Sequence, residues 1–153
     1  MPTAETLYMV VPCYNEEEVL HETAKRLKEK YQSLMARGLI SDRSRVVFVN
    51  DGSKDKTWSI IKELHETDPE FFSGVNLAHN AGHQNAVLAG LMTVKELCDM
   101  AITMDADLQD DINTIDAMVE NTTRAIRSFT ASAAPEIPIP SSSASRRRAS
   151  INS

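Results

Sequence analysis

Short apolar runs alternate with longer amphipathic stretches along most of this chain. The runs are rich in Val, Ile, Phe and Met and are too short for core helices, so they are typical of strands buried on both faces of a sheet. In the stretches between them, apolar residues recur every three or four positions, as in helices that cover a sheet. The alternation predicts an α/β fold in which crossover helices join parallel strands.

The boundaries of these elements follow from the pattern and from the turn residues between them. We expect four strands, at residues 7–12, 45–50, 72–78 and 100–104. We expect three covering helices, from Glu16 to a stop at Gly38, through Trp58, Ile61 and Leu64 to Asp68, and from Gly82 to Leu97. This order predicts one doubly wound half-sheet in a domain of residues 1–120.

Charge and hydropathy exclude several classes of function. The net charge of −6 argues against a nucleic-acid binder that relies on overall charge. No apolar run approaches the length of a bilayer span, and the first residues lack the basic start of a secretory signal, so we expect a cytoplasmic protein. Cys13 and Cys98 match no metal or disulfide spacing and are expected to be reduced thiols.

Polar segments follow all four expected strands, where ligands bind in sheets of this kind. After the second strand, Asp51 is placed to accept a hydrogen bond from a nucleobase imino group or a ribose hydroxyl, and Gly52 allows close backbone approach. Each segment alone is equally typical of a turn or a helix cap. The glycine patterns of dinucleotide-binding folds and P-loops are absent, which disfavours those classes.

The segment after the fourth strand is rich in carboxylates. Asp105 and Asp107 are two residues apart, and in an extended chain their Cα atoms lie roughly 7 Å apart with both side chains on one face. Such a pair is able to hold Mg²⁺ or Mn²⁺, which accept one or two carboxylates and complete their shell with water and substrate phosphates. The alternative is a solvated acidic loop before a helix from Asp111 onward.

Four motifs stand in order at the strand ends: Val11–Glu17, Val49–Thr57, Asn80–Ala86 and Asp105–Asp111. Together they resemble the motifs of family-2 inverting glycosyltransferases, and more narrowly the polyprenyl-phosphate group of dolichol-phosphate mannosyltransferases and bactoprenol glucosyltransferases. The resemblance covers residues 7 to about 120. It implies the nucleotide-binding half of a GT-A (Rossmann-like) fold, truncated here, that binds a nucleotide-diphosphate sugar.

The resemblance also implies roles for residues in the donor site. Pro12, Tyr14 and Glu16 are expected to line the nucleoside pocket. Asp51 is expected to contact the base or ribose. His83 stands where relatives place a basic residue near the phosphates, although a solvent-exposed histidine at a helix start is an equal alternative.

Metal binding and catalysis are expected from the acidic segment. By resemblance, Asp105 lies near the ribose and the metal, and Asp107 with Gln109 holds the cation on the diphosphate. Asp107, Asp110 and Asp111 are the candidate catalytic residues. A phosphate acceptor is already ionised near pH 7, so it needs no strong base, whereas a sugar hydroxyl needs one, such as Asp110 or Asp111.

The function, including the acceptor of any transferred sugar, stays open at this point. The first hypothesis is a polyprenyl phosphate, with relatives attached to the cytoplasmic face of the membrane through C-terminal helices that this chain lacks. The second is a sugar hydroxyl of a growing polysaccharide. The third is a non-catalytic module that binds nucleotide and metal in an acidic pocket.

Residues 121–153 depart from the family. They carry five arginines and one acid, and prolines at 135, 138 and 140 interrupt any helix or strand. With one base restored near codon 121, the neighbouring reading frame is able to encode a family-like continuation. We therefore expect residues 121–153 to be a disordered, low-complexity, off-frame tail.

Overall fold

The computed structural model describes residues 4–108 and 112–133. Within these residues, a single parallel sheet forms the centre, and four helices accompany it. The strands are β1 (Leu7–Cys13), β2 (Arg45–Asn50), β3 (Phe72–Asn76) and β4 (Met100–Thr103). The helices are α1 (Leu20–Ala36), α2 (Thr57–Thr67), α3 (His83–Val94) and α4 (Thr114–Ala133).

The strand order in the sheet is β3-β2-β1-β4, and all neighbouring strands are parallel. Val10 of β1 lies opposite Val47 of β2 on one side and Thr103 of β4 on the other. The chain runs outward from β1 to β3 and then returns to place β4 on the other side of β1. The order therefore reverses beside β1, and a crevice is expected at the carboxyl ends of β1 and β4.

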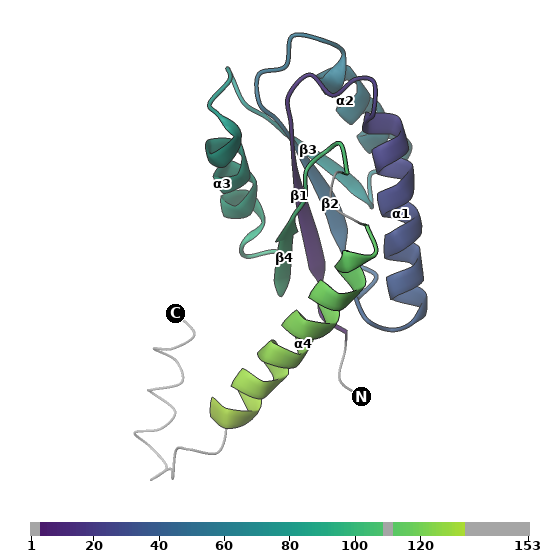
Figure 1. Ribbon diagram of the computed structural model, residues 1–153, viewed down its shortest axis with the longest axis vertical. Coiled ribbons are helices and arrows are strands. Elements are labelled where there is room, and N and C mark those ends of the chain that lie inside the picture. Colours follow the sequence, from purple (N-terminus) through teal and green to yellow (C-terminus); the bar gives the residue numbers. More distant parts are fainter. Residues whose placement is uncertain (1–3, 109–111, 134–153) are drawn as a thin grey trace. The chain divides into compact units, whose positions relative to one another are not determined.

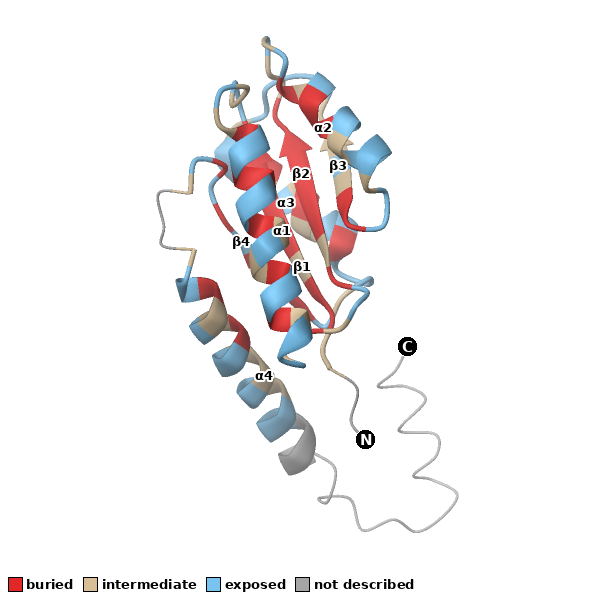
Figure 2. Cartoon of the chain, turned by 90° about the vertical axis from the view of Figure 1, so that its right-hand side faces the viewer, coloured by how far each residue is buried: buried red, intermediate tan, exposed pale blue. Residues whose placement is uncertain are grey.

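The helices cover the two faces of the sheet unequally. Figure 1 shows α3 on one side of the sheet and α1 and α2 on the other. Figure 2 shows the result: the strands are mostly buried, and α1 presents an exposed face to solvent. The predicted doubly wound α/β architecture is confirmed.

Packing on the α3 face depends on a close approach of backbone to sheet. Val10, Val47 and Val49 form the core there with Ala86 of α3. Gly90 of α3 lies so close that a Cβ atom at this position would collide with the Val10 side chain and lie 2.9 Å from Cγ2 of Val49. The missing side chain therefore lets α3 sit directly on β1 and β2.

The opposite face has an aromatic core. Phe48 and Phe72 stack with ring centroids 5.8 Å apart, and Phe71 meets Tyr31 edge to face at 5.1 Å. The Tyr31 hydroxyl donates to the Arg45 carbonyl at 3.0 Å. This hydrogen bond satisfies the polar end of a fully buried ring.

Several boundaries differ from those expected. α1 begins at Leu20 rather than Glu16, because the residues before it form a loop whose amides donate to side chains of a second loop. β3 ends at Asn76, β4 ends at Thr103 and α3 ends at Val94, so these elements are shorter than expected. β2 has the expected bounds.

α4 continues past residue 121, where the composition of the chain changes. The chain divides into two units between Glu120 and Asn121, but α4 continues to Ala133. The expectation of disorder from residue 121 is therefore wrong for residues 121–133, where neither Pro nor Gly interrupts the helix. Residues 134–153 lie outside the described residues. Over the part of the chain that the structure describes, no helix combines the length and apolar character that crossing a membrane requires.

Candidate functional site

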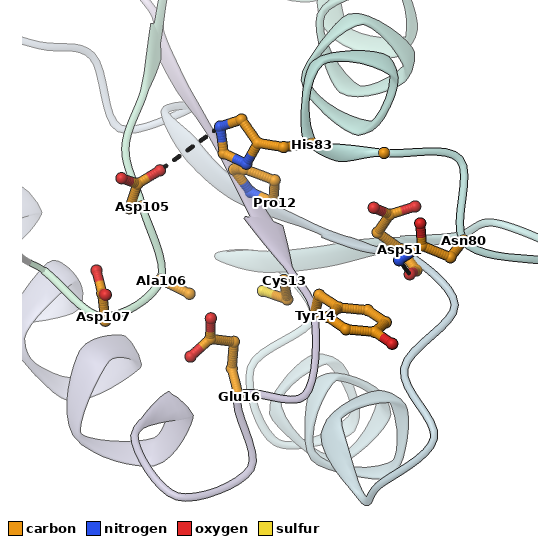
Figure 3. A pocket seen from close by; sticks show the side chains of 11 residues that line it. Pro12, Cys13, Tyr14, Glu16, Asp51, Asn80, His83, Asp105, Ala106 and Asp107 are labelled. Atoms are coloured by element: carbon orange, nitrogen blue, oxygen red, sulfur yellow. Dashed lines mark hydrogen bonds and ion pairs between the residues drawn. The ribbon is translucent and has the colours of Figure 1, made fainter.

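A pocket of about 300 Å³ lies at the carboxyl ends of β1, β2 and β4 and at the start of α3. Figure 3 shows Asp105 and Asp107 on one side, Asp51 and Asn80 on the other, and Tyr14 and Glu16 between them. The crevice expected from the strand order is therefore present. The lining residues are Pro12, Cys13, Tyr14, Glu16, Asp51, Asn80, Gly82, His83, Asp105, Ala106 and Asp107.

The structure brings together seven residues that the sequence marks as site candidates. They are Pro12, Tyr14, Glu16, Asp51, His83, Asp105 and Asp107. Gln109, Asp110 and Asp111 lie outside the described residues, so their expected roles stay predictions. Sequence reasoning did not single out Asn80 as a site residue, although it stands in the same motif as His83.

The loops after β1 and β2 are joined by hydrogen bonds between backbone and side chains. The Asn15 amide donates to Ser53 Oγ at 2.9 Å, and the Lys54 amide donates back to Asn15 Oδ1 at 2.9 Å. Asn15 adopts a positive φ of 53°, which asparagine tolerates better than most residues. The Glu16 amide donates to Thr57 Oγ1 at 2.8 Å. These bonds hold Tyr14 and Glu16 at the mouth of the pocket.

Asp55 stabilises the same contact between the loops after β1 and β2. Its Oδ1 accepts from the Thr57 amide at 2.9 Å and from the Thr57 hydroxyl at 2.5 Å. Burial alone raises the pKa of Asp55, but the hydrogen bonds from Thr57 and from the Glu17 amide outweigh it and lower that pKa. Asp55 is therefore an ionised structural residue of the loop.

Asp51 forms the wall opposite the acid pair. It is 3% exposed, its amide donates to the Cys13 carbonyl at 2.9 Å, and its Oδ1 accepts the Ala81 amide at 2.7 Å. The neighbouring Gly52 has a φ of 69°, and a Cβ there would collide with the Asn80 backbone nitrogen. The loops after β2 and β3 thus abut, backbone to backbone.

The acidic side of the pocket is built on a turn after β4. The Leu108 amide donates to the Asp105 carbonyl at 3.1 Å, so Asp105 and Asp107 lie in a turn rather than at the end of an extended strand. The Ala106 carbonyl accepts the Thr23 hydroxyl of α1 at 2.5 Å. Across the pocket, His83 Nε2 lies 3.7 Å from Asp105 Oδ1 (Figure 3).

Negative charge accumulates between these loops. Burial raises the pKa of Glu16, and the carboxylates of Asp107, Asp55 and Asp105 raise it further. Burial also raises the pKa of the Cys13 thiol far above its usual value, with a contribution from Glu16. Cys13 is therefore protonated and unreactive. The carboxylates gathered around Glu16 make the pocket favourable to a cation.

No three His, Cys, Asp or Glu side chains among residues 4–108 and 112–133 converge closely enough to hold a metal by themselves. The chemistry of the pocket nevertheless fits a hard divalent cation. Mg²⁺ and Mn²⁺ need only one or two protein carboxylates when water and substrate phosphates supply the other ligands. Asp105 and Asp107 supply carboxylates of that kind.

Comparison with known proteins decides the family. The family model described as "Glycosyl transferase family 2" matches residues 8–141. The chain belongs to glycosyl transferase family 2. It is 48% identical over 109 residues to the uncharacterized glycosyltransferase YkoT of Bacillus subtilis, covering 71% of this chain and 32% of that protein. It is 38% identical over 112 residues to the bactoprenol glucosyl transferase of Shigella phage SfV, covering 73% of this chain and 34% of that protein.

A solved structure has the same fold at lower identity. The mannosyltransferase PcManGT from Pyrobaculum calidifontis, in complex with GDP-Man and Mn²⁺, superposes with a TM-score of 0.57 at 24% identity. The match covers 68% of this chain and 28% of that one. The predicted GT-A fold of this family-2 chain is confirmed. The chain spans about a third of the length of the curated relatives named above.

Proposed function

We propose that this chain carries the donor-binding half of a glycosyltransferase that moves a sugar from a nucleotide-diphosphate donor to a polyprenyl phosphate. One observation supports it above the others: a polar and aromatic wall and a pair of carboxylates line the same pocket at the strand-order reversal. Nucleosides are commonly held by the first kind of surface, and a diphosphate with its cation by the second.

Binding of the nucleoside is assigned to the wall made by β1 and β2. The Tyr14 ring is 44% exposed and lines the pocket, so it offers a face on which a base stacks. Pro12 and Glu16 line the pocket on the same loop, and Asp51 offers a carboxylate to the base or ribose. His83, at the start of α3, is assigned to the diphosphate.

Asp105 and Asp107 are the residues assigned to hold Mg²⁺ or Mn²⁺. The cation, when bound, offsets negative charge on the diphosphate leaving group. The raised pKa of Glu16 supports this assignment, because after burial its causes are the negative charges of Asp107, Asp55 and Asp105, which a cation offsets.

The chemistry at the sugar is an inverting displacement. A phosphate oxygen of the acceptor forms a bond to C1 of the sugar on the face opposite the leaving diphosphate, the C1–O bond to the diphosphate breaks, and the nucleoside diphosphate leaves. An acceptor phosphate is mostly ionised near pH 7, since its second pKa is about 6, so the attacking oxygen has no proton to lose. The similarity to a bactoprenol glucosyl transferase supports a lipid phosphate in this role.

Donor binding is tested by calorimetric titration of the 153-residue chain with UDP-glucose and GDP-mannose, with and without Mn²⁺. We expect at least one donor to bind in a Mn²⁺-dependent manner and Asp107→Ala to weaken it about tenfold or more, the effect of losing a charge-assisted contact. Asp42→Ala is the matched control, because Asp42 is exposed in the loop before β2. Absence of binding, or binding indifferent to Asp107, contradicts the proposal.

The acceptor is tested separately by incubating the chain and labelled donor with a short polyprenyl phosphate or an oligosaccharide. Label on the lipid phosphate supports the proposal. Label on the oligosaccharide alone contradicts it.

A further inference from the structure

The turn that carries Asp105 and Asp107 has a backbone that its own residues do not hold alone. Both acids are exposed, whereas Ala106 between them is buried, and Figure 3 shows the three in succession along one loop. The Leu108 amide closes the turn on the Asp105 carbonyl at 3.1 Å. Leu108 has a φ of 52°, a conformation that leucine rarely adopts and that persists only where surrounding contacts fix it.

Thr23 of α1 supplies such a contact from behind the turn. Its side chain is buried, and its hydroxyl donates to the Ala106 carbonyl at 2.5 Å. Thr23 is itself fixed, because its amide donates to the Val19 carbonyl at 2.9 Å in the first turn of the helix. The carbonyl between the two acids therefore has a buried partner, and removing that partner leaves a buried acceptor unsatisfied, which is costly.

The same side of α1 also holds the chain that follows the acid pair. Thr23, Lys30 and Arg37 are spaced seven residues apart, about two helical turns each, so they lie in one row along the helix. Lys30 Nζ donates to Asn113 Oδ1 at 3.3 Å and lies 3.0 Å from Asp116 Oδ1. Arg37 Nη2 lies 2.6 Å from Asp116 Oδ2. α1 thus fixes the backbone on both sides of the acidic segment.

We propose that Thr23 is a positioning residue for the divalent cation, and that its hydrogen bond to Ala106 sets the separation of the two carboxylates before the cation binds. This inference rests on the proposed function, which assigns Asp105 and Asp107 to the cation, and deepens it. Thr23 is not one of the residues that line the pocket, so it acts through the backbone of the turn. Groups that orient metal ligands from behind commonly change metal affinity about 10-fold to 100-fold.

The first test is calorimetric titration of the 153-residue chain with Mn²⁺ in the presence of UDP-glucose or of GDP-mannose. Thr23→Val keeps the shape of the side chain and removes the donor, so Mn²⁺ affinity is expected to fall about tenfold. Thr23→Ser keeps the hydroxyl and is expected to restore the affinity to within about threefold of that of the unchanged chain.

Thr6→Val is the matched control at the opposite end of the sheet. Thr6 is also buried, and its hydroxyl is hydrogen-bonded to Ser41 Oγ at 2.8 Å. Both valine variants are expected to lower the melting temperature, but Thr6→Val should leave Mn²⁺ affinity unchanged, because it does not touch the turn.

The outcomes separate this inference from the proposed function. If Thr23→Val melts at a lower temperature but binds Mn²⁺ as the unchanged chain does, Thr23 has a structural role only. If Thr6→Val and Thr23→Val lose Mn²⁺ affinity equally, the effect is a general loosening of the fold. Either result overturns the inference and leaves the proposed function standing. Absence of Mn²⁺ binding by the unchanged chain with both donors overturns both.

A second measurement needs no variant and decides the case in which Thr23→Val does not fold. Amide hydrogen exchange of the unchanged chain reports on the Leu108 amide, which closes the turn. We expect this amide to exchange about tenfold or more slowly than an unprotected amide without Mn²⁺, and Mn²⁺ with donor to slow it little further. Exchange at the unprotected rate, slowed only when Mn²⁺ and donor are added, shows that the cation orders the turn and overturns the inference.

Discussion

Polar residues at the strand ends divide into two groups that the sequence alone does not separate. Asp51, Asp105 and Asp107 line the pocket. Ser53 and Thr57 stand in the same motif as Asp51, but their hydroxyls accept backbone amides of the facing loop. Both groups use the same residue types, because hydroxyls and carboxylates serve ligands and loop amides equally well.

Replacing Thr57 by Ala tests the structural group. Thr57 is fully buried, and the change leaves the Glu16 amide without its partner at 2.8 Å. We expect the free energy of unfolding to fall by about 1–3 kcal/mol, measured by urea denaturation. Thr57→Ser keeps the hydroxyl, so its free energy of unfolding is expected to fall clearly less than that of Thr57→Ala. Equal losses in the two variants would show that the methyl group, rather than the hydroxyl, matters.

At the scale of elements, the position of α3 depends on Gly90. Gly90→Ala adds a Cβ that collides with Val10 and lies 2.9 Å from Val49 Cγ2, two buried side chains with little room to move. We expect a loss of about 1–3 kcal/mol despite the better helix propensity of Ala, measured by urea denaturation. Met92→Ala on the exposed side of α3 is the control, and we expect it to change stability by about 0.5 kcal/mol or less. A Gly90→Ala variant as stable as the unchanged protein contradicts this packing.

The first turn of α4 is tied to α1 by ion pairs. Asp116 lies 3.0 Å from Lys30 Nζ and 2.6 Å from Arg37 Nη2. Burial alone raises the pKa of Asp116, but hydrogen bonds and charge from Lys30 and Arg37 lower it overall. The folded chain therefore holds this proton less tightly than the unfolded chain, so the contribution is present above the ordinary carboxyl pKa and is lost as pH falls through the folded value.

Asp116→Asn is expected to lower the free energy of unfolding by about 1 kcal/mol or less near pH 7, since the pair is partly solvated. The difference from the unchanged protein should shrink as pH falls toward about 3. Urea denaturation at several pH values measures it, with Asp42→Asn as an exposed control. A difference that is constant with pH contradicts an ionic origin.

The strands and helices were largely predictable, because a strand buried on both faces of a sheet appears in the sequence as an unbroken apolar run. β2 reads as an unbroken apolar run and has the expected bounds. The start of α1 was not predictable, because Val19 and Leu20 continue a helical pattern while long-range bonds hold the preceding residues in a loop. Local sequence does not record partners that stand forty or so residues away.

At the scale of the whole molecule, the position of the pocket was predictable, whereas the hydrogen bonds between the loops that line it were not. Placing Asp51 and Asp107 in one crevice needs only parallel strands and a reversal of their order. The bond from the Ala81 amide to Asp51 depends on how two loops abut at Gly52, and no pattern in the sequence carries that information.

The off-frame origin of residues 121–153 is a prediction for the whole chain. The composition change at that point and the division after Glu120 are its motivation. We expect the DNA across codons 118–124 to open, with one base restored, into a family-like continuation in the neighbouring frame. The same frame read across codons 60–90 is the control and should give no such continuation. DNA whose neighbouring frame encodes no family-like continuation beyond codon 124 contradicts the prediction.

The hydrogen bonds between the loops after β1 and β2 also bear on how fast a donor is captured. Because Ser53, Asn15 and Thr57 hold that wall through hydrogen bonds within the protein itself, the wall has little conformational entropy to lose when a donor binds. The encounter is therefore expected to be governed by diffusion and by cation availability, and to vary only weakly with temperature.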